Sequence, residues 1–391
     1  MSRTVCIIGT RGYPSYYGGF ETMVRHLAPY LVEQGWQVIV YCRPRGVSDG
    51  AELDDRVRRV FTSGVDGKSL STLTFGFTSA VHAATVVPDV ALVMNVANGF
   101  WLPILRARRI PTLVNVDGIE WERDKWGAAA RAVFRIGGSL TARYATDLVY
   151  DSTALGARWQ GKFGRSGVFI PYGGVFRCPR PPAPTLTRRG YVLLVARFVP
   201  ENTIEPFVEA AAAISSRWPV VIVGSSGYGG VIEDRVQNLA NTSPNVQWLG
   251  HVSDDDALFA LWENAGAYFH GHSVGGTNPA LVQAMACGAP TVARDTPYNR
   301  EVLGEFAEYV EPTSDAIVRG LEKVLTDSDR QDELGAGAML RARERYTWER
   351  VCKAYDEALS EMIDDPSRAR HAAGRALTRL RARASPQESI G

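Results

Sequence analysis

The chain has 391 residues, a length that exceeds one ordinary hydrophobic core and predicts about two domains. Hydrophobic residues make up 45% and charged residues 22% of the chain, which is typical of soluble globular proteins. The formal net charge of +1 provides no overall positive field and therefore argues against nucleic acid as the main partner.

The cysteines are odd in number, scattered and without CxxC spacing: Cys6, Cys42, Cys178, Cys287 and Cys352. This pattern argues against a disulfide framework and a zinc site, and favours a reducing compartment. No apolar stretch approaches the roughly 20 residues of a membrane span, and the chain begins directly with a predicted strand. We therefore expect a cytoplasmic protein, and peripheral contact with the inner face of the plasma membrane stays open.

The first elements form a βαβ unit, which implies a parallel sheet. Thr4–Gly9 predicts a strand, Thr10–Gly19 a glycine-rich turn, Phe20–Gln34 a helix and Val38–Cys42 the next strand. The turn does not match GxGxxG, which argues against dinucleotide binding, although a glycine pair stands directly before the helix.

Alternation of strands and helices continues to a proline-rich segment at 179–189 and resumes after it. Before this segment, apolar runs predict strands at Val90–Met94, Thr112–Val116 and Asp147–Tyr150, and Ile170–Gly174 is interpreted as the last strand of this half with its exit turn. After it, six more are expected at Tyr191–Ala196, Val220–Gly224, Val246–Leu249, Ala267–Phe269, Thr291–Ala293 and Tyr309–Val310.

These patterns predict an α/β protein with two doubly wound, Rossmann-like domains, 1–178 and 190–345, joined by a linker at 179–189. A closing helix is expected within 346–366. In open α/β sheets ligands bind beyond the carboxyl ends of the strands, so we expect a site in the cleft that the two domains face.

The stretch His270–Pro290, HGHSVGGTNPALVQAMACGAP, predicts a helix that is entered through glycines. Asn278 can cap the first turn, Pro279 suits the first helical position, and Gly288 with Pro290 ends the run. Such a helix start presents backbone N–H groups and a partial positive charge, so it can hold an anion.

Two segments suggest metal binding at first sight. Asp254, Asp255 and Asp256 form a DxD pattern, but they follow Ser253 and precede a helical run, which predicts a helix cap and first turn. His270 and His272 lack a third ligand at a useful spacing, which favours hydrogen bonding over zinc.

The end of the chain, 367–391, is rich in Ala and Arg. We predict a disordered tail, since the segment has few large apolar residues to bury. A basic helix that forms on an anionic membrane is the alternative.

Together these motifs resemble the GT-B glycosyltransferases of family 4, and within them the subgroup with the DUF1972 domain, which includes rhamnosyltransferases of surface-polysaccharide synthesis. The resemblance is carried by GTRGYPSYYGGFET, NVDGIEWERDKWG, IPYGG, ARFVPENTIEPFVEA and the HGHSVGGTNPALVQAMACGAP stretch with the DTPYNREVLGE that follows it. The motifs are spread over residues 1 to about 359.

The resemblance implies a nucleotide-diphosphate sugar as donor, a dTDP-, UDP- or GDP-sugar, without a metal ion or other cofactor. On this basis Arg197 grips the diphosphate together with the helix start at Gly275, Gly276, Thr277 and Asn278. Many relatives have a Lys shortly after this Arg, where this chain has Asn202 and Thr203. His270 and His272 are expected beside the donor.

The paired glutamates of the family fall here on Gly275 and Gln283, which is a departure. In relatives the second glutamate typically holds the ribose hydroxyls. Gln283 keeps the length and hydrogen-bonding capacity but not the charge, which suggests the hypothesis of a deoxyribose donor such as a dTDP-sugar.

In the first domain the resemblance assigns donor contacts to Gly18 and Gly19, where any Cβ would intervene. Asp117 is the candidate catalytic carboxylate, at the edge where many relatives have a His, and Glu120 competes with it. Acceptor binding is expected from Glu21, Glu120 and Trp121, and Trp121 with Trp126 can form an apolar platform for the acceptor.

The resemblance thus implies a retaining, metal-independent hexosyltransferase, with L-rhamnose as a candidate sugar and a saccharide or polyprenyl-linked saccharide as acceptor. Two alternatives are a catalytically silent scaffold that binds a glycan or a partner glycosyltransferase, and a nucleotide-sugar epimerase of the same fold.

Overall fold

A computed structural model describes residues 3–15, 18–47, 53–65, 71–123, 126–183, 185–227 and 229–364. The predicted basic tail at 367–391 lies outside these residues. The chain forms two compact units. Of the described residues, the first unit contains those up to Glu122, those from Trp126 to Pro171 and those from Val351 onward, and the second contains Arg123 and 172–350.

The first unit contains a parallel sheet with the strand order β3-β2-β1-β4-β5-β6-β7. Its strands are β1 (Thr4–Ile8), β2 (Gln37–Cys42), β3 (Arg58–Phe61), β4 (Val90–Met94), β5 (Thr112–Asn115), β6 (Asp147–Tyr150) and β7 (Val168–Phe169). Its helices are α1 (Gly19–Glu33), α2 (Ser71–Val86), α3 (Leu102–Ala107), α4 (Ala128–Tyr144), α5 (Thr153–Phe163) and α13 (Trp348–Asp364), with short 3-10 turns η1 (Val96–Trp101) and η2 (Glu120–Glu122).

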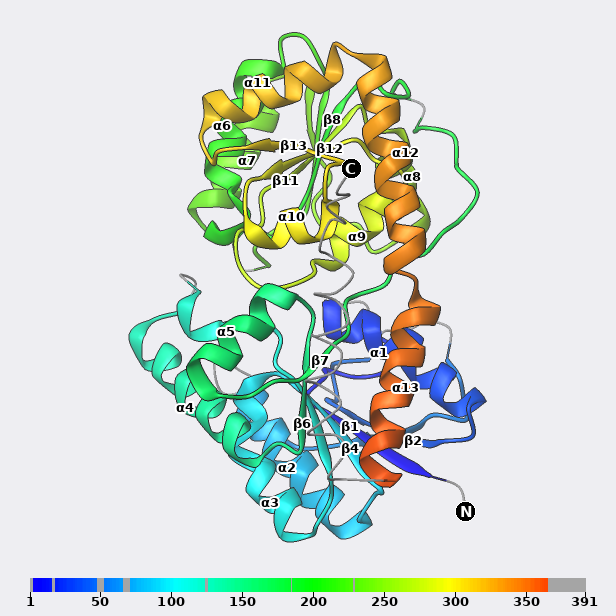
Figure 1. The fold of residues 1–391 in the computed structure, drawn as a ribbon. Coiled ribbons are helices and arrows are strands. Elements are labelled where there is room, and N and C mark those ends of the chain that lie inside the picture. Colours follow the sequence, from blue (N-terminus) through cyan, green and yellow to red (C-terminus); the bar gives the residue numbers. More distant parts are fainter. Residues whose placement is uncertain are drawn as a thin grey trace, which may run out of the picture. The chain divides into compact units, whose positions relative to one another are not determined.

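In the first unit α2, α3, α4 and α5 lie on one side of the sheet, and α1 and α13 lie on the other (Figure 1). Helix α13 is tied to its unit by polar contacts, because Asn115 donates to the Tyr355 hydroxyl at 2.8 Å and the Trp36 indole donates to Asp356 at 2.7 Å. The expected closing helix is therefore an integral part of the first unit.

The second unit contains a parallel sheet with the strand order β10-β9-β8-β11-β12-β13. Its strands are β8 (Val192–Val195), β9 (Val220–Val223), β10 (Val246–Trp248), β11 (Ala267–His270), β12 (Thr291–Arg294) and β13 (Glu308–Val310). Its helices are α6 (Ile204–Ile214), α7 (Val231–Thr242), α8 (Asp255–Asn264), α9 (Pro279–Ala286), α10 (Pro297–Leu303), α11 (Ser314–Leu325) and α12 (Ser328–Arg345), with the 3-10 turn η3 (Pro200–Asn202).

Two apolar layers sandwich this second sheet. Phe207, Val236 and Ile317, from α6, α7 and α11, pack on one face, whereas Phe259 and Leu281, from α8 and α9, pack on the other. Figure 1 shows these helices on opposite sides of the sheet. Both units are doubly wound, which confirms the predicted fold class.

One predicted strand was misplaced, and one strand was missed. Ile170–Gly174 lies outside the sheet, because β7 ends at Phe169 and Gly174 forms only an isolated bridge with Thr347. Strand β3 was missed because its residues, Arg58–Phe61, lie at the sheet edge and are mostly exposed, so they form no apolar run.

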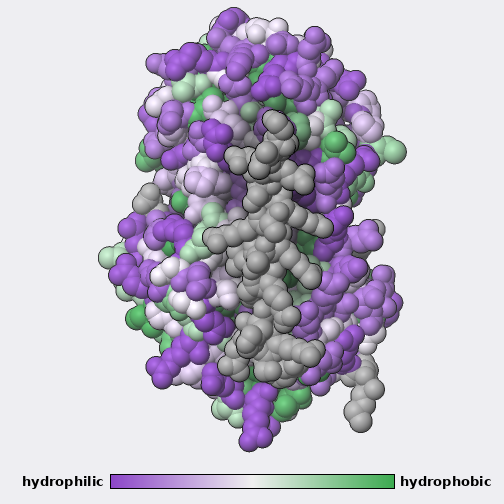
Figure 2. Space-filling view, in the orientation of Figure 1, coloured by the Kyte–Doolittle hydropathy of each residue, from purple (hydrophilic) through white to green (hydrophobic). Residues whose placement is uncertain are grey.

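The surface in Figure 2 is mostly hydrophilic, with scattered hydrophobic residues. Within the described part of the chain, no helix is both long enough and apolar enough to span a membrane. The five cysteines form no disulfide, and all but Cys178 are buried.

Candidate functional site

Each sheet has one point where the strand order reverses, between β1 and β4 in the first unit and between β8 and β11 in the second. The loops that leave the carboxyl ends of these neighbouring strands diverge to opposite faces of the sheet, and ligands bind in the crevice that this opens. Most of the candidate residues lie on the loops at the carboxyl edge of each sheet or just beyond them.

In the second unit, the loop after β8 carries Arg197 and Asn202, and the loop after β11 carries His272. The Arg197 side chain is exposed, and its backbone carbonyl accepts a hydrogen bond from Asn202 Nδ2 at 2.7 Å. Asn202 Oδ1 in turn lies 2.6 Å from His272 Nδ1. The buried Asn202 therefore ties the two loops together.

His270 ends strand β11 and is 4% exposed. Its Nδ1 lies 3.0 Å from the Tyr268 hydroxyl, and Nε2 has no hydrogen-bond partner among the described residues. Burial lowers the pKa of His270 to about 3. The pKa of His272 is also held well below its usual value, by burial and then by the nearby charges of Arg123, His270 and Arg197. Both rings are therefore neutral at physiological pH.

Gly275 adopts a φ of 96°, a conformation that favours glycine. A glutamate at this position would be strained. A Cβ on Gly275 would lie 3.6 Å from an Nη atom of Arg123 and 3.8 Å from Nε2 of His272. Arg123 is 9% exposed and belongs to the second unit, and sequence reasoning did not single it out.

Helix α9 begins as the sequence predicts. The Asn278 side chain accepts a hydrogen bond from the Ala280 amide at 2.9 Å, and Pro279 takes the first helical position. A cap of this kind stabilises a helix by about 1 kcal/mol. Gly276 and the buried Thr277 lead from Gly275 into this helix, whose amino-terminal end carries a partial positive charge.

Gln283 lies on α9 and is 8% exposed. Its Oε1 accepts from the Val175 amide and its Nε2 donates to the Val175 carbonyl, both at 2.9 Å. Both ends of the Gln283 side-chain amide are therefore bound to one backbone residue. This pairing gives Gln283 a structural contact, and its contact with the ribose and the hypothesis of a deoxyribose donor stay predictions.

Two further residues at this edge were missed. Thr203 has a φ of 57°, which is unusual for a β-branched residue. Its hydroxyl donates to the Gly271 carbonyl at 2.6 Å and accepts from Arg294 at 3.0 Å. Arg294 ends β12, so a guanidinium lies beside the position where many relatives have a Lys. An unusual φ leaves no signal in the sequence.

In the first unit, Glu21 is 7% exposed and lies in the first turn of α1. Its carboxylate accepts from the Arg11 amide at 2.9 Å and from the Thr10 hydroxyl at 3.3 Å. Glu21 therefore orders the loop after β1, and Gly18 and Gly19 stand directly before it at the helix start. A Cβ on Gly18 would lie 3.3 Å from this carboxylate.

Asp117 follows β5 in the left-handed conformation, with a φ of 62°. Its amide donates to Asn115 Oδ1 at 2.9 Å, and Asn95 Nδ2 lies 3.4 Å from Asp117 Oδ2. Asn95 follows β4, also with a positive φ of 68°. Two strand ends thus bring a carboxylate and a carboxamide together, and Asn95 was not predicted.

The two tryptophans of the EWERDKW segment have different environments. Trp121 is 3% exposed. Its ring packs against Trp159 and Phe163, and the Lys162 ammonium lies 4.5 Å from its centroid, so the expected acceptor platform at Trp121 has little surface to offer. Trp126 is partly exposed, and its indole donates to Glu120 Oε2 at 2.8 Å. The buried Glu120 thus positions the Trp126 ring.

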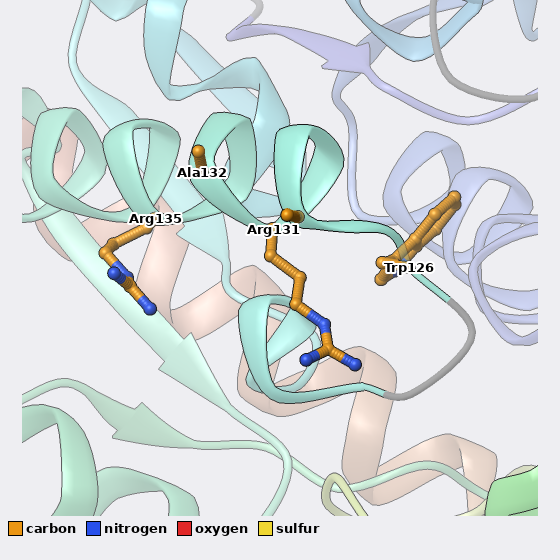
Figure 3. Close-up of a pocket in the computed structure, with 5 residues that line it drawn as sticks. Trp126, Arg131, Ala132 and Arg135 are labelled. Atoms are coloured by element: carbon orange, nitrogen blue, oxygen red, sulfur yellow. The ribbon is translucent and has the colours of Figure 1, made fainter.

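Trp126 lines a pocket of about 480 Å³ with residues of α4: Ala128, Arg131, Ala132 and Arg135. Arg131 and Arg135 are about one turn apart and project from the same side of α4 (Figure 3). The pocket therefore combines an indole ring with two guanidinium groups. It belongs to the first unit, and the second-unit residues described above do not line it.

The DxD pattern is part of a helix start, as predicted. Asp254 caps α8 by accepting from the amides of Asp256 and Ala257, and Asp256 pairs with Arg177 and Arg180. Among the described residues, no group of three His, Cys, Asp or Glu side chains is arranged to hold a metal ion.

Two family matches divide the chain much as the two sheets do. Residues 18–173 match the family described as Glycosyl transferase 4-like domain. Residues 181–341 match the family described as Glycosyl transferases group 1. Together the two matches span most of the chain.

Two curated proteins match parts of the chain. O-antigen chain mannosyltransferase B of Escherichia coli is 26% identical over 187 residues, which are 44% of this chain and 48% of that protein. Sucrose synthase isoform 1 of Daucus carota is 33% identical over 76 residues, 18% of this chain and 9% of that protein. The chain thus matches about half of the first relative and a small part of the second.

Solved structures match nearly the whole chain. Sucrose-phosphate synthase from Thermosynechococcus elongatus has a TM-score of 0.78 at 19% identity and covers 93% of this chain and 99% of its own. Anabaena HepE in complex with UDP-glucose has a TM-score of 0.70 at 16% identity, over 92% of this chain and 99% of its own. At such identities the likeness establishes the shared fold of two Rossmann-like domains.

Proposed function

Because the chain belongs to the GT4-like glycosyltransferases of the GT-B fold, we propose that it transfers a hexosyl group from a nucleotide-diphosphate sugar to a hydroxyl of a saccharide acceptor. The observation that carries this proposal is the carboxyl edge of the second sheet. There the guanidinium of Arg197, two neutral imidazoles and the amino-terminal end of α9 follow the two strands at the reversal point.

This edge suits a diphosphate. The exposed Arg197 guanidinium can donate two parallel hydrogen bonds to phosphate oxygens, and the amides at the start of α9 add a partial positive charge. Negative charge grows on the diphosphate as it leaves, so groups held in place here stabilise the transition state more than the ground state. We propose that they do so without a metal ion.

We further propose that the anomeric configuration is retained by front-face attack. The acceptor oxygen bonds to the anomeric carbon on the side from which the diphosphate departs, and the acceptor proton passes to a diphosphate oxygen. Asp117, held by the Asn115 contact, then has the task of orienting the acceptor hydroxyl or the sugar. To orient the acceptor hydroxyl, the Asp117 carboxylate must be held in the right position, and its pKa need not be shifted.

For the donor we carry forward three candidates. L-Rhamnose follows from the subgroup resemblance, a mannosyl donor from the name of the Escherichia coli relative, and a glucosyl donor from the UDP-glucose complex of HepE. The hypothesis that Gln283 favours a deoxyribose nucleotide such as dTDP stays one of these candidates, beside its contact with Val175.

For the acceptor we propose a saccharide, free or polyprenyl-linked, in surface-polysaccharide synthesis. The pocket beside Trp126 supports this, because an indole ring can stack on a sugar face and the guanidiniums of Arg131 and Arg135 can meet an anionic group. Peripheral binding at the inner face of the plasma membrane would follow from a lipid-linked acceptor. Flotation of the full chain with anionic liposomes tests that binding.

The proposed function is tested by a thermal-shift panel of dTDP-rhamnose, GDP-mannose and UDP-glucose, followed by transfer assays with the donor that stabilises most. We expect one donor to raise the midpoint and then to be consumed only when an acceptor is present. A silent scaffold would bind without turnover, and an epimerase would convert the donor in the absence of acceptor. Either result would replace the transferase assignment.

A further inference from the structure

A relay of hydrogen bonds fixes which nitrogen of His272 carries the proton. The Arg197 carbonyl can only accept, so Asn202 must present Nδ2 to it, and its Oδ1 is thereby turned toward His272 Nδ1. Since Oδ1 also only accepts, Nδ1 carries the hydrogen. The ring also makes a backbone hydrogen bond with Val274. Since the neutral ring holds a single hydrogen, on Nδ1, Nε2 is left as an acceptor.

The Nε2 atom of His272, a hydrogen-bond acceptor, lies near the same position as a hydrogen-bond donor, an Nη atom of Arg123. A Cβ on Gly275 would lie 3.8 Å from His272 Nε2 and 3.6 Å from an Nη atom of Arg123, and apart from its chain neighbours no other described atom would come within 4 Å. Gly275 itself is buried, and its φ of 96° disfavours any side chain that would fill this space. One N–H donor and one lone-pair acceptor therefore flank the space beside the Gly275 Cα.

The chemistry of this pair selects its ligand. A hydroxyl can accept from the guanidinium and donate to the imidazole, so it satisfies both groups at once. A phosphate oxygen only accepts and would bring its negative charge against the Nε2 lone pair. The pair therefore suits a sugar hydroxyl and is poorly matched to the diphosphate, which the start of α9 suits better.

We propose that Arg123 and His272 recognise one hydroxyl of the donor hexose in the space beside Gly275, and so determine which sugar is transferred. This proposal deepens the proposed function and rests on it. Arg123 lies outside both the β8 and β11 loops, so the resulting pocket depends on a residue from the segment that follows β5. His272 is held in register by Asn202, which makes Asn202 a positioning residue.

The test compares bare nucleotide with sugar nucleotide. Binding of three pairs of bare and sugar nucleotide, UDP and UDP-glucose, GDP and GDP-mannose, dTDP and dTDP-rhamnose, is measured by calorimetry for the wild type, Arg123→Met and His272→Phe. Arg235→Ala is the matched control, since Arg235 lies on the exposed face of α7 in the same unit and pairs with Glu205. We expect both site variants to bind the preferred sugar nucleotide at least tenfold more weakly while affinity for its bare diphosphate stays within twofold. Retained diphosphate binding also reports that the variants are folded.

Deoxy analogues of the preferred donor identify the hydroxyl. The wild type should lose affinity for one of them, and Arg123→Met should bind that analogue and the parent sugar nucleotide equally well. An equal loss for bare diphosphate and sugar nucleotide would make Arg123 a phosphate contact and overturn the proposal, as would unchanged affinities in both site variants. If the wild type binds none of the six nucleotides, the proposed function itself fails, and the inference fails with it.

Discussion

The two units share a doubly wound sheet, yet the carboxyl edges of the two sheets carry different functional groups. In the second unit this edge carries Arg197, Arg294 and two neutral imidazoles. In the first unit it carries the carboxylates of Glu21 and Asp117. The same topology therefore offers one edge suited to an anion and one suited to hydroxyl groups. Function is set by the side chains after the strands, and the fold alone does not decide it.

The two edges also differ in how they are held. On the second sheet, Asn202 links two loops through side chains and Thr203 stays in an unusual conformation with support from Gly271 and Arg294. On the first sheet, the loop after β1 folds around a single buried carboxylate, Glu21. Changes in the second unit should therefore act on donor binding, and changes in the first on the acceptor side.

The largest effect is expected for Arg197→Ala in the second unit. Loss of a guanidinium that stabilises the leaving diphosphate should lower kcat about 10²- to 10³-fold. Because the Arg197 side chain is exposed, the melting temperature should stay within about 1 °C of the wild type. Steady-state transfer assays with Arg235→Ala as control make the measurement. Unaltered turnover would remove Arg197 from the site.

In the first unit, Asp117→Asn should lower kcat by about 10- to 100-fold, since it removes the charge but keeps the shape. Asn tolerates the positive φ of 62° at this position, so the backbone is retained. Nucleotide binding, measured by calorimetry, should not change. Glu120→Gln is the companion variant. If Glu120→Gln has the larger effect on kcat, the catalytic assignment moves from Asp117 to Glu120.

Gln283→Glu distinguishes a structural amide from a nucleotide contact. A carboxylate can still accept from the Val175 amide but cannot donate to its carbonyl, and it would be buried as a charge. We expect a loss of about 1–3 kcal/mol in the free energy of unfolding by urea. Gln237→Glu, the same change on an exposed face of α7, should be nearly neutral. A Gln283→Glu variant that is fully stable and binds UDP more tightly would restore the ribose contact.

Residue preferences at helix starts predicted much of the carboxyl edge of the second sheet from the sequence. Asn278, Pro279 and the Asp254 cap follow from residue preferences at helix starts, and the structure confirms all three. The parallel strands followed from apolar runs because most strands here are buried on both faces. Edge strand β3 was not predicted, because its residues are mostly exposed and form no apolar run.

What the sequence did not predict depends on residues that are distant along the chain. The pairing of Gln283 with Val175 spans 108 positions, and the approach of Arg123 to Gly275 joins two motifs that were considered separately. Trp121 and Trp126 have similar local sequence, but only packing decides that Trp121 is buried and Trp126 partly exposed. No local pattern encodes such contacts.

The smallest effect is a pH dependence of stability that has opposite signs in the two units. Burial lowers the pKa of His270 to about 3, so between pH 6.5 and 3 the unfolded chain binds a proton that the native second unit does not. Stability is therefore lost as the pH falls, by about 1 kcal/mol per pH unit. Burial raises the pKa of Asp147 in the first unit to about 6, so between pH 6 and 3.8 the native state holds the extra proton and a falling pH stabilises that unit.

Urea unfolding at pH 7 and pH 5 separates the two contributions. His270→Gln should flatten the loss of stability on acidification, although only in part, because the lowered pKa of His272 acts in the same direction. Asp147→Asn should steepen that loss, because it removes the opposing contribution. The difference between the two pH values, rather than stability at either one, is the quantity to compare, since each variant also changes packing. If the free energy of unfolding changed equally with pH in the wild type, His270→Gln and Asp147→Asn, this would contradict the idea that His270 and Asp147 make opposite contributions.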